Sequence, residues 1–340
     1  MDALVLRVAI LVLAFAFPAW IALSLAIVLG RLRHDRRLQE QGGAELGGRE
    51  ARPLLRRAGS RPHTEWGRWR RVSALTRLAR AHHPATQRLL QPALADRDQR
   101  IATAAIRSLG DLGDEWAIDI LVSSLRSGSV PRSRVAAELE RLVPVPGPRF
   151  VPLLRDLNPA VRFWAATLLG PYPELGRESL IALTWDPDPN VRAAAVETLG
   201  SRSGDAVGVA LLARLGDPVW FVRVHATRAA GHVLGVGAAS SISGLLADEQ
   251  WWVRSAAKDA FRSMGPDAVP ALLSVLAHPD SFARNGAAEV LQDIGFVDRL
   301  ALEQPESPLL VRIYEAGGEN LKLAAEQRAG RKRHDRVKAA

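Results

Sequence analysis

Apolar residues recur at three- and four-residue spacing in a series of short segments along the chain. This spacing places them on one face of a helix, which would be buried against a neighbour. The segments are residues 117–125, 150–156, 178–185, 206–216 and 267–277. No stretch alternates apolar and polar residues in the way that a half-buried strand does. The pattern therefore predicts an all-α chain.

A turn and an alanine-rich helix follow each of these segments. Residues 186–200 read DPDPNVRAAAVETLG, in which Asp suits a helix cap and Pro suits the first helical turn. Glycines 170, 200 and 231 are predicted to end the second helices. The arginine of this pattern recurs at positions 71, 102, 132, 162, 192, 223, 254 and 284, with Ala102 replacing it once. A period of 30 to 31 residues predicts an α-solenoid of about seven to eight helical hairpins.

The turn and second helix resemble a HEAT repeat of the short bacterial type, similar to those of phycobilisome lyase subunits. The resemblance covers residues 66–300 and implies a right-handed solenoid that serves as a binding surface. It also implies that turn aspartates and helix arginines staple adjacent repeats. The matching residues are Asp186, Asp217, Asp248, Arg162, Arg192, Arg223, Arg254 and Arg284.

The first thirty residues have a different composition. Residues 8–29 carry no charge, and a helix of this length would be about 33 Å long, enough to cross the hydrocarbon core. A cleavable signal peptide is the alternative, but the run is long and basic residues follow it directly. We therefore expect a transmembrane anchor over 1–30, a basic flexible linker over 31–65, the solenoid over 66–304, and a cap with a basic tail over 305–340.

The flanking charges predict an orientation. Four arginines follow the apolar run, and positive charge marks the cytoplasmic side. The chain also has no cysteine, which fits a reducing compartment. The composition indicates a bacterium with GC-rich DNA. We expect a single-pass protein of the bacterial inner membrane, with its N-terminus outside and its solenoid cytoplasmic.

The net charge of +9 is concentrated in the two ends of the chain, and residues 66–318 carry only +1. A solenoid that binds DNA needs a basic groove, so we do not expect nucleic acid as a partner. The basic residues nearest the apolar run are instead expected to face anionic lipid headgroups. The candidates are Arg31, Arg33, Arg36, Arg37, Arg68, Arg70 and Arg71. The basic segment 331–338 is either a second lipid contact or a solvated tail.

Aromatic residues stand in register at the start of three successive second helices. They are Trp220, Phe221, Trp251, Trp252 and Phe282. They form either a partner-binding ridge, since aromatic side chains are enriched in interfaces, or a layer packed between repeats. By the HEAT resemblance, the second helices also line a concave groove. Its exposed positions would include Glu197, Arg228, Lys258 and Glu289.

Catalytic and cofactor motifs are absent from the sequence. There is no Gly-rich phosphate loop, nucleophile elbow or HExxH motif. His225 and His232 share a helix, but two histidines alone are a poor metal site. We therefore expect no enzyme activity, no metal and no cofactor. The favoured function is a membrane scaffold or adaptor for a protein partner. The alternatives are an accessory subunit of a polysaccharide synthase (glycosyltransferase) or a transporter, a lyase- or glycosylase-like enzyme, and a nucleic-acid tether.

Overall fold

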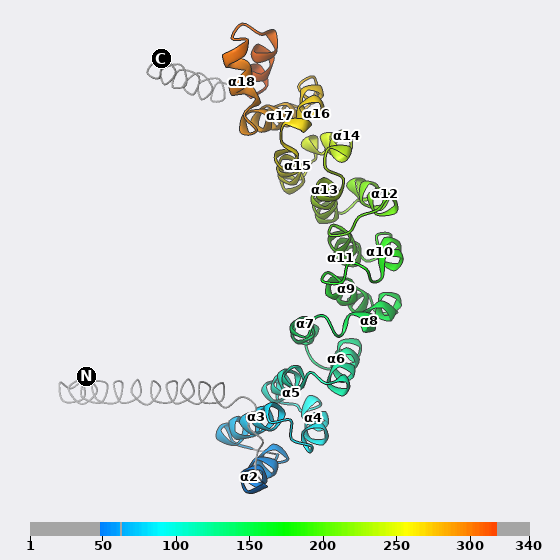
Figure 1. Cartoon of the computed structure of the whole chain (residues 1–340), viewed down its shortest axis with the longest axis vertical. Coiled ribbons are helices and arrows are strands. Elements are labelled where there is room, and N and C mark those ends of the chain that lie inside the picture. Colours follow the sequence, from blue (N-terminus) through cyan, green and yellow to red (C-terminus); the bar gives the residue numbers. More distant parts are fainter. Residues whose placement is uncertain (1–47, 62, 318–340) are drawn as a thin grey trace, which may run out of the picture. The chain divides into compact units, whose positions relative to one another are not determined.

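The computed structural model describes residues 48–61 and 63–317, and within these ranges all regular structure is helical (Figure 1). The predicted all-α class therefore holds for the described chain. The chain divides into two compact units, with the boundary between Arg141 and Leu142. The predicted transmembrane helix over 1–30 lies outside the described residues, as does the tail beyond residue 317.

The first unit contains three helical pairs, in which α3, α5 and α7 pack in sequence on one another. Its helices are α2 (Gly48–Ala58), α3 (Glu65–Arg80), α4 (Thr86–Leu94), α5 (Gln99–Leu112), α6 (Glu115–Ser127) and α7 (Arg132–Arg141). The expectation of a flexible linker over 31–65 is wrong for α2. Ala51, Leu54 and Ala58 lie on one face of α2, because they are spaced three and four residues apart. All three are buried.

The second unit continues the two-layer arrangement. Helices α9, α11, α13, α15 and α17 form one row of neighbours, and shorter helices precede each of them (Figure 1). The elements are α8 (Gly147–Phe150), η1 (Val151–Arg155), α9 (Pro159–Leu168), α10 (Arg177–Leu183), α11 (Pro189–Leu199), α12 (Asp205–Ala213), η2 (Arg214–Gly216), α13 (Trp220–Leu234), η3 (Gly235–Ala238), α14 (Ala239–Ser243), η4 (Gly244–Ala247), α15 (Trp251–Met264), η5 (Gly265–Ala268), α16 (Val269–Val275), α17 (Ser281–Asp293) and α18 (Phe296–Glu303). Residues 308–317 are also helical, with Leu310 and Ile313 buried.

The sequence period locates the second helix of every repeat. All eight positions of the arginine pattern fall on helices, from Arg71 on α3 to Arg284 on α17. The helix predicted over 150–156 is largely the short 3₁₀ segment η1, which has a proline in its first turn. Pro152 lacks the N–H that a longer α-helix would use.

Gly231 does not end its helix, contrary to the prediction. Helix α13 runs on to Leu234 and stops at Gly235, whose φ of 53° suits glycine. A Cβ atom at Gly231 would lie 2.9 Å from the Cβ of Ala260 on α15. Gly231 is therefore needed for the close approach of two helices.

Buried or half-buried ion pairs join successive repeats in the second unit. Each of three arginines donates from Nε and Nη2 to both oxygens of the aspartate that opens the next turn, at 2.7 to 2.8 Å. The pairs, here called the carboxylate ladder, are Arg162–Asp186, Arg192–Asp217 and Arg223–Asp248. The staple implied by the HEAT resemblance is confirmed for these three pairs.

The ladder residues also form hydrogen bonds with the backbone of the turn that precedes each second helix. Nη1 of Arg192 donates to the carbonyl oxygen of Asp186 at 2.9 Å, and Arg223 does the same to Asp217. Oδ1 of Asp217 accepts the backbone N–H of Val219 at 3.0 Å. Burial raises the pKa of Asp217, but the Arg192 and Val219 hydrogen bonds and the charges of Arg192 and Arg214 lower it more. The folded protein therefore favours the charged carboxylate.

One helical run among the described residues has the length and apolar composition of a membrane span. It covers residues 220–247, with a mean hydropathy of 1.4, and includes α13 and α14. Core helices of soluble proteins meet the same two criteria, so this run by itself is weak evidence for a span. It also carries the ladder residue Arg223, which holds it in the array of repeats.

Candidate functional site

The predicted aromatic residues lie at the N-terminal ends of α13, α15 and α17, and four of the five are exposed. Their exposed fractions are 41% for Trp220, 56% for Trp251, 56% for Trp252 and 64% for Phe282, and Phe221 is half-buried. We call these five residues the aromatic ridge. Their exposure opposes the alternative that they form a packed layer between repeats.

Ring contacts in the ridge occur within each repeat. The rings of Trp220 and Phe221 meet edge to face at 5.8 Å, and those of Trp251 and Trp252 at 4.8 Å. Edge-to-face pairs hold each other's orientation. Each pair therefore leaves apolar surface open to solvent in a fixed geometry.

Helices α13 and α15, which carry the two aromatic pairs, differ from their neighbours α11 and α17 at the N-cap. Asp188 and Asp280 cap α11 and α17 with side-chain oxygens. Val219 and Gln250 stand at this position in α13 and α15 and make no side-chain cap. Side-chain caps are normally favoured here, so α13 and α15 give up a stabilising contact where the aromatic pairs begin.

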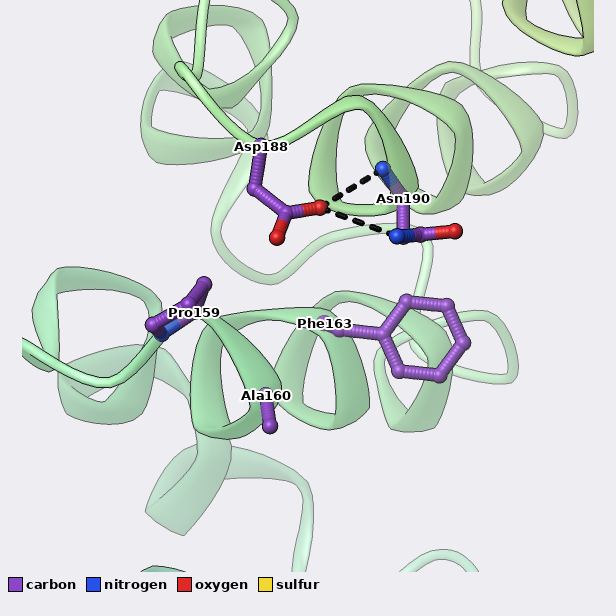
Figure 2. Close-up of a pocket in the computed structure, with 5 residues that line it drawn as sticks. All are labelled: Pro159, Ala160, Phe163, Asp188 and Asn190. Atoms are coloured by element: carbon purple, nitrogen blue, oxygen red, sulfur yellow. Dashed lines mark hydrogen bonds between the residues drawn. The ribbon is translucent and has the colours of Figure 1, made fainter.

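A hollow replaces the ridge in the two preceding repeats of the unit. It measures about 330 Å³ and lies between the starts of α9 and α11. Its lining residues are Pro159, Ala160, Phe163, Asp188 and Asn190 (Figure 2). Pro159 and Ala160 occupy the repeat positions that Trp220 and Phe221 hold later, so smaller side chains leave the space. Oδ1 of Asp188 accepts from Asn190, which leaves the rim mostly apolar.

The predicted groove residues divide into two groups. Glu197 and Arg228 are exposed, as expected. Lys258 and Glu289 are half-buried, and they are joined to each other by hydrogen bonds of 2.9 and 3.1 Å. Arg262 also donates to Glu289, at 2.7 Å. These charges staple α15 to α17.

The predicted lipid-facing arginines also differ from one another. Arg31, Arg33, Arg36 and Arg37 lie outside the described residues. The prediction is wrong for Arg71, which is buried and donates to the carbonyl oxygen of Ala58 and to Asp96. Its position 25 residues before Asp96 makes it the equivalent of a ladder arginine.

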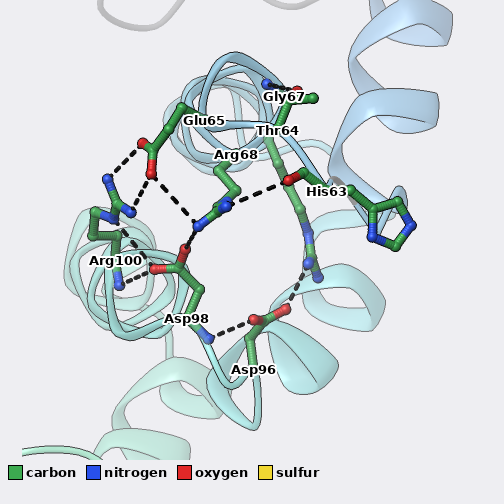
Figure 3. A network of polar contacts seen from close by, with 9 residues as sticks. His63, Thr64, Glu65, Gly67, Arg68, Asp96, Asp98 and Arg100 are labelled. Carbon is green, nitrogen blue, oxygen red and sulfur yellow. Dashed lines mark hydrogen bonds and ion pairs between the residues drawn. The ribbon is translucent and has the colours of Figure 1, made fainter.

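Arg68 belongs to a network of polar contacts beside Arg71, shown in Figure 3. It bonds Asp98 at 3.3 Å and the carbonyl oxygen of His63, and Glu65 bonds Arg100 with two contacts of 2.8 and 2.9 Å. Arg70 is exposed, with its guanidinium 5.0 Å from the ring centre of Trp66. Of the three described candidates, Arg70 is the one that presents its charge to solvent.

Histidine and carboxylate side chains do not gather into a metal site in the part of the chain that the structure describes. His225 on α13 lies 3.6 Å from Glu197 on α11, the second helix of the preceding repeat. Two such groups form an inter-repeat contact and are too few to enclose a metal ion.

Sequence reasoning missed two features of the second unit. Arg202 is buried and donates to four backbone oxygens, three of which belong to the loop before α10. Burial lowers the pKa of Arg202. The ladder also stops at His278, which occupies the place held by Asp186, Asp217 and Asp248. The repeat alignment contains this substitution, so the sequence could have revealed it.

Comparison with known proteins agrees with the repeat assignment. The HEAT repeats family model matches residues 65–140 and 147–231. These two segments therefore carry HEAT repeats, and the period of 30 to 31 residues runs through the helices from α3 to α17. A search of curated proteins finds no match.

Two solved structures are similar to the chain. One is an engineered protein with 19% identity and a TM-score of 0.41, covering 82% of this chain and 92% of that one. Another is human deoxyhypusine hydroxylase in complex with glycerol, with 20% identity and a TM-score of 0.31, covering 72% of this chain and 96% of that one.

Proposed function

We propose that the chain is a membrane-anchored scaffold whose HEAT repeats bind a protein partner through the aromatic ridge. The observation that carries this proposal is the exposure of Trp220, Trp251, Trp252 and Phe282 on three successive repeats. Exposed aromatic clusters of this kind mark interaction sites, because burying them against a partner removes apolar surface from water. HEAT repeats also generally mediate protein–protein interactions.

The proposed anchor is the uncharged run over residues 8–29, which would hold the repeats at the bacterial inner membrane. The arginines that follow it favour a cytoplasmic array. Arg70 would then contact anionic headgroups. In this proposal the chain binds and positions a partner and does not itself catalyse a reaction.

The test is in-cell crosslinking of the tagged full-length protein followed by mass spectrometry. A variant carrying Ala at Trp220, Phe221, Trp251 and Trp252 is compared with Trp66→Ala, which removes a tryptophan of similar exposure, 58%, from another repeat. We expect one partner to be lost from the ridge variant and retained by Trp66→Ala, with both variants folded.

Retention of the same partner by the folded ridge variant would assign the contact to another surface. Loss from both variants would mean that the partner depends on general surface hydrophobicity. Either result contradicts the ridge as the specific binding site.

A further inference from the structure

Arg254 and Arg284 have the geometry of ladder arginines, but neither has a carboxylate partner among the described residues. Nη1 of Arg254 donates to the carbonyl oxygens of Asp248 and Glu249 at 2.7 and 3.1 Å. Nη1 of Arg284 likewise donates to two carbonyl oxygens, at 2.8 and 2.7 Å. These contacts match those that orient Arg192 and Arg223. Both guanidinium groups are thus held in place from one side.

Arg254 lacks a carboxylate partner among the described residues because His278 stands where the next ladder aspartate would be. Nδ1 of His278 accepts the backbone N–H of Asp280 at 3.1 Å, as Oδ1 of Asp248 accepts that of Gln250 at 2.8 Å. A carboxylate has a second oxygen for the arginine. A neutral imidazole that accepts through Nδ1 carries its proton on the other nitrogen and has no second acceptor.

The unfilled edge of Arg254, consisting of Nε and Nη2, is here called the open fork. In the three preceding repeats the equivalent edge binds a carboxylate through two hydrogen bonds. A guanidinium fork matches a carboxylate in shape and charge, so a held fork is ready to bind one. The ladder therefore shows, within the same unit, what this edge accepts.

The open fork adjoins the aromatic ridge. The guanidinium carbon of Arg254 lies 4.9 Å from the ring centre of Phe282. Trp251 and Trp252 begin the helix that carries Arg254. A ligand at the fork would consequently have exposed aromatic surface beside its charged group.

We propose that Arg254 binds an aspartate or glutamate side chain of the protein partner, and that an adjacent apolar residue of that partner packs on the ridge. This inference rests on the proposed function and specifies the chemistry of the partner. The partner's carboxylate binds Nε and Nη2 of Arg254 as Asp248 binds those of Arg223, but from beside His278, and it completes the ladder between two proteins. Arg284 offers a second fork of the same kind one repeat further on.

The experiment is selection of random displayed peptides on the full-length chain, followed by affinity measurements with the selected peptides. Each acidic peptide is paired with a version in which Asn or Gln replaces Asp or Glu, and with a phosphoserine version. The decisive variants are His278→Asp, which supplies an internal carboxylate, and Arg254→Lys, which keeps the charge and removes the fork. Arg155→Lys is the matched control, since Arg155 is exposed and lies on η1, away from the ridge and from the predicted groove positions.

We expect the wild type to enrich peptides with an acidic residue beside an apolar one. Amide replacement and either decisive variant should weaken their binding about tenfold or more, because a charge-assisted bidentate contact is lost. Arg155→Lys should stay within about twofold, as expected for a side chain that contacts no peptide. Arg254→Lys decides the outcome should His278→Asp fail to fold.

Three results would overturn the inference. Equal binding of acidic and amide peptides, lost on Trp251→Ala/Trp252→Ala, would leave the ridge as the site and remove the role of the fork. Binding of phosphoserine peptides alone would replace the carboxylate with a phosphate. No enrichment on any version of the protein would contradict both the fork and the proposed function.

Discussion

Asp217→Ala should be among the most destabilising single changes in the second unit. The substitution removes a carboxylate that accepts from Arg192 at 2.8 Å and from Arg214 at 3.3 Å. The Asp217 side chain is fully buried and each arginine side chain is about 10% exposed. Loss of one member of a buried pair leaves the other charge without compensation, which costs about 3–5 kcal/mol. That is a large share of the stability of an ordinary domain, about 5–15 kcal/mol.

The assay is hydrogen exchange followed by mass spectrometry on the full-length protein at neutral pH. Because each repeat contacts only its neighbours, the loss of protection should centre on α11 and α13 and leave α3 and α5 unchanged. Glu65→Ala is the matched control. Glu65 makes two contacts with Arg100 at 2.8 and 2.9 Å, but its side chain is 71% exposed. Solvent screens this pair, so no measurable change is expected.

The reasoning is refuted if Asp217→Ala costs less than about 1 kcal/mol, the range of an exposed pair, or if Glu65→Ala has an equal effect. Acid provides a second check. The folded pKa of Asp217 is lowered, so its contribution is complete above the pKa of the unfolded side chain, about 3.9. It is lost progressively as the pH falls below that value toward the folded pKa. The stability difference between wild type and Asp217→Asn should therefore shrink on acidification.

Three further predictions test other contacts. Gly231→Ala should lower the free energy of unfolding by about 1–3 kcal/mol in urea denaturation, since its Cβ would press on Ala260; an unchanged midpoint would show that the helices separate freely. Arg202→Met should lower the free energy of unfolding by at least about 2 kcal/mol, because four backbone carbonyl oxygens lose a charged donor. Hydrogen-exchange protection should fall over residues 169–175, and retained protection there would contradict the prediction. Arg70→Gln should weaken flotation of the full-length protein with anionic vesicles at unchanged stability, whereas Arg71→Gln should lower the melting temperature; the reverse pattern would reassign both side chains.

Much of the fold could be predicted because the repeat is local and regular. A helix start recurs at intervals of 30 to 31 residues and marks the second helix of each repeat from α3 to α17, with an arginine in its first turns in every case but Ala102 on α5. Helix α2 was missed because its composition is rich in Arg and Gly, although the spacing of Ala51, Leu54 and Ala58 carried the helical signal. Gly231 was read as a cap because a small residue at a helix interface and one at a helix end look alike in sequence.

The candidate site was less predictable because exposure depends on neighbouring repeats. The aromatic register at Trp220 and Trp251 was visible in the sequence, but the openness of the ridge was not. Arg71 and Arg70 are adjacent in sequence, and packing against α2 and Asp96 buries only Arg71. The open fork at Arg254 could be recognised only from the structure. His278 still accepts the backbone N–H of its turn, as the ladder aspartates do, but it does not accept from the arginine.

The carboxylate ladder also bears on how such a chain can change its length. Each rung uses the same two-part contact, an arginine that holds its own turn and the aspartate of the next turn. Removal of residues 187–217 as one whole unit would take out Arg192 and Asp217 together, and it would leave the Arg162–Asp186 and Arg223–Asp248 pairs at their present spacing in sequence. Duplication of that unit would likewise create a junction with an existing pair of partners. Growth or shortening by whole repeats therefore needs no new interface within the ladder, whereas the end at His278 leaves Arg254 with backbone carbonyl partners alone among the described residues.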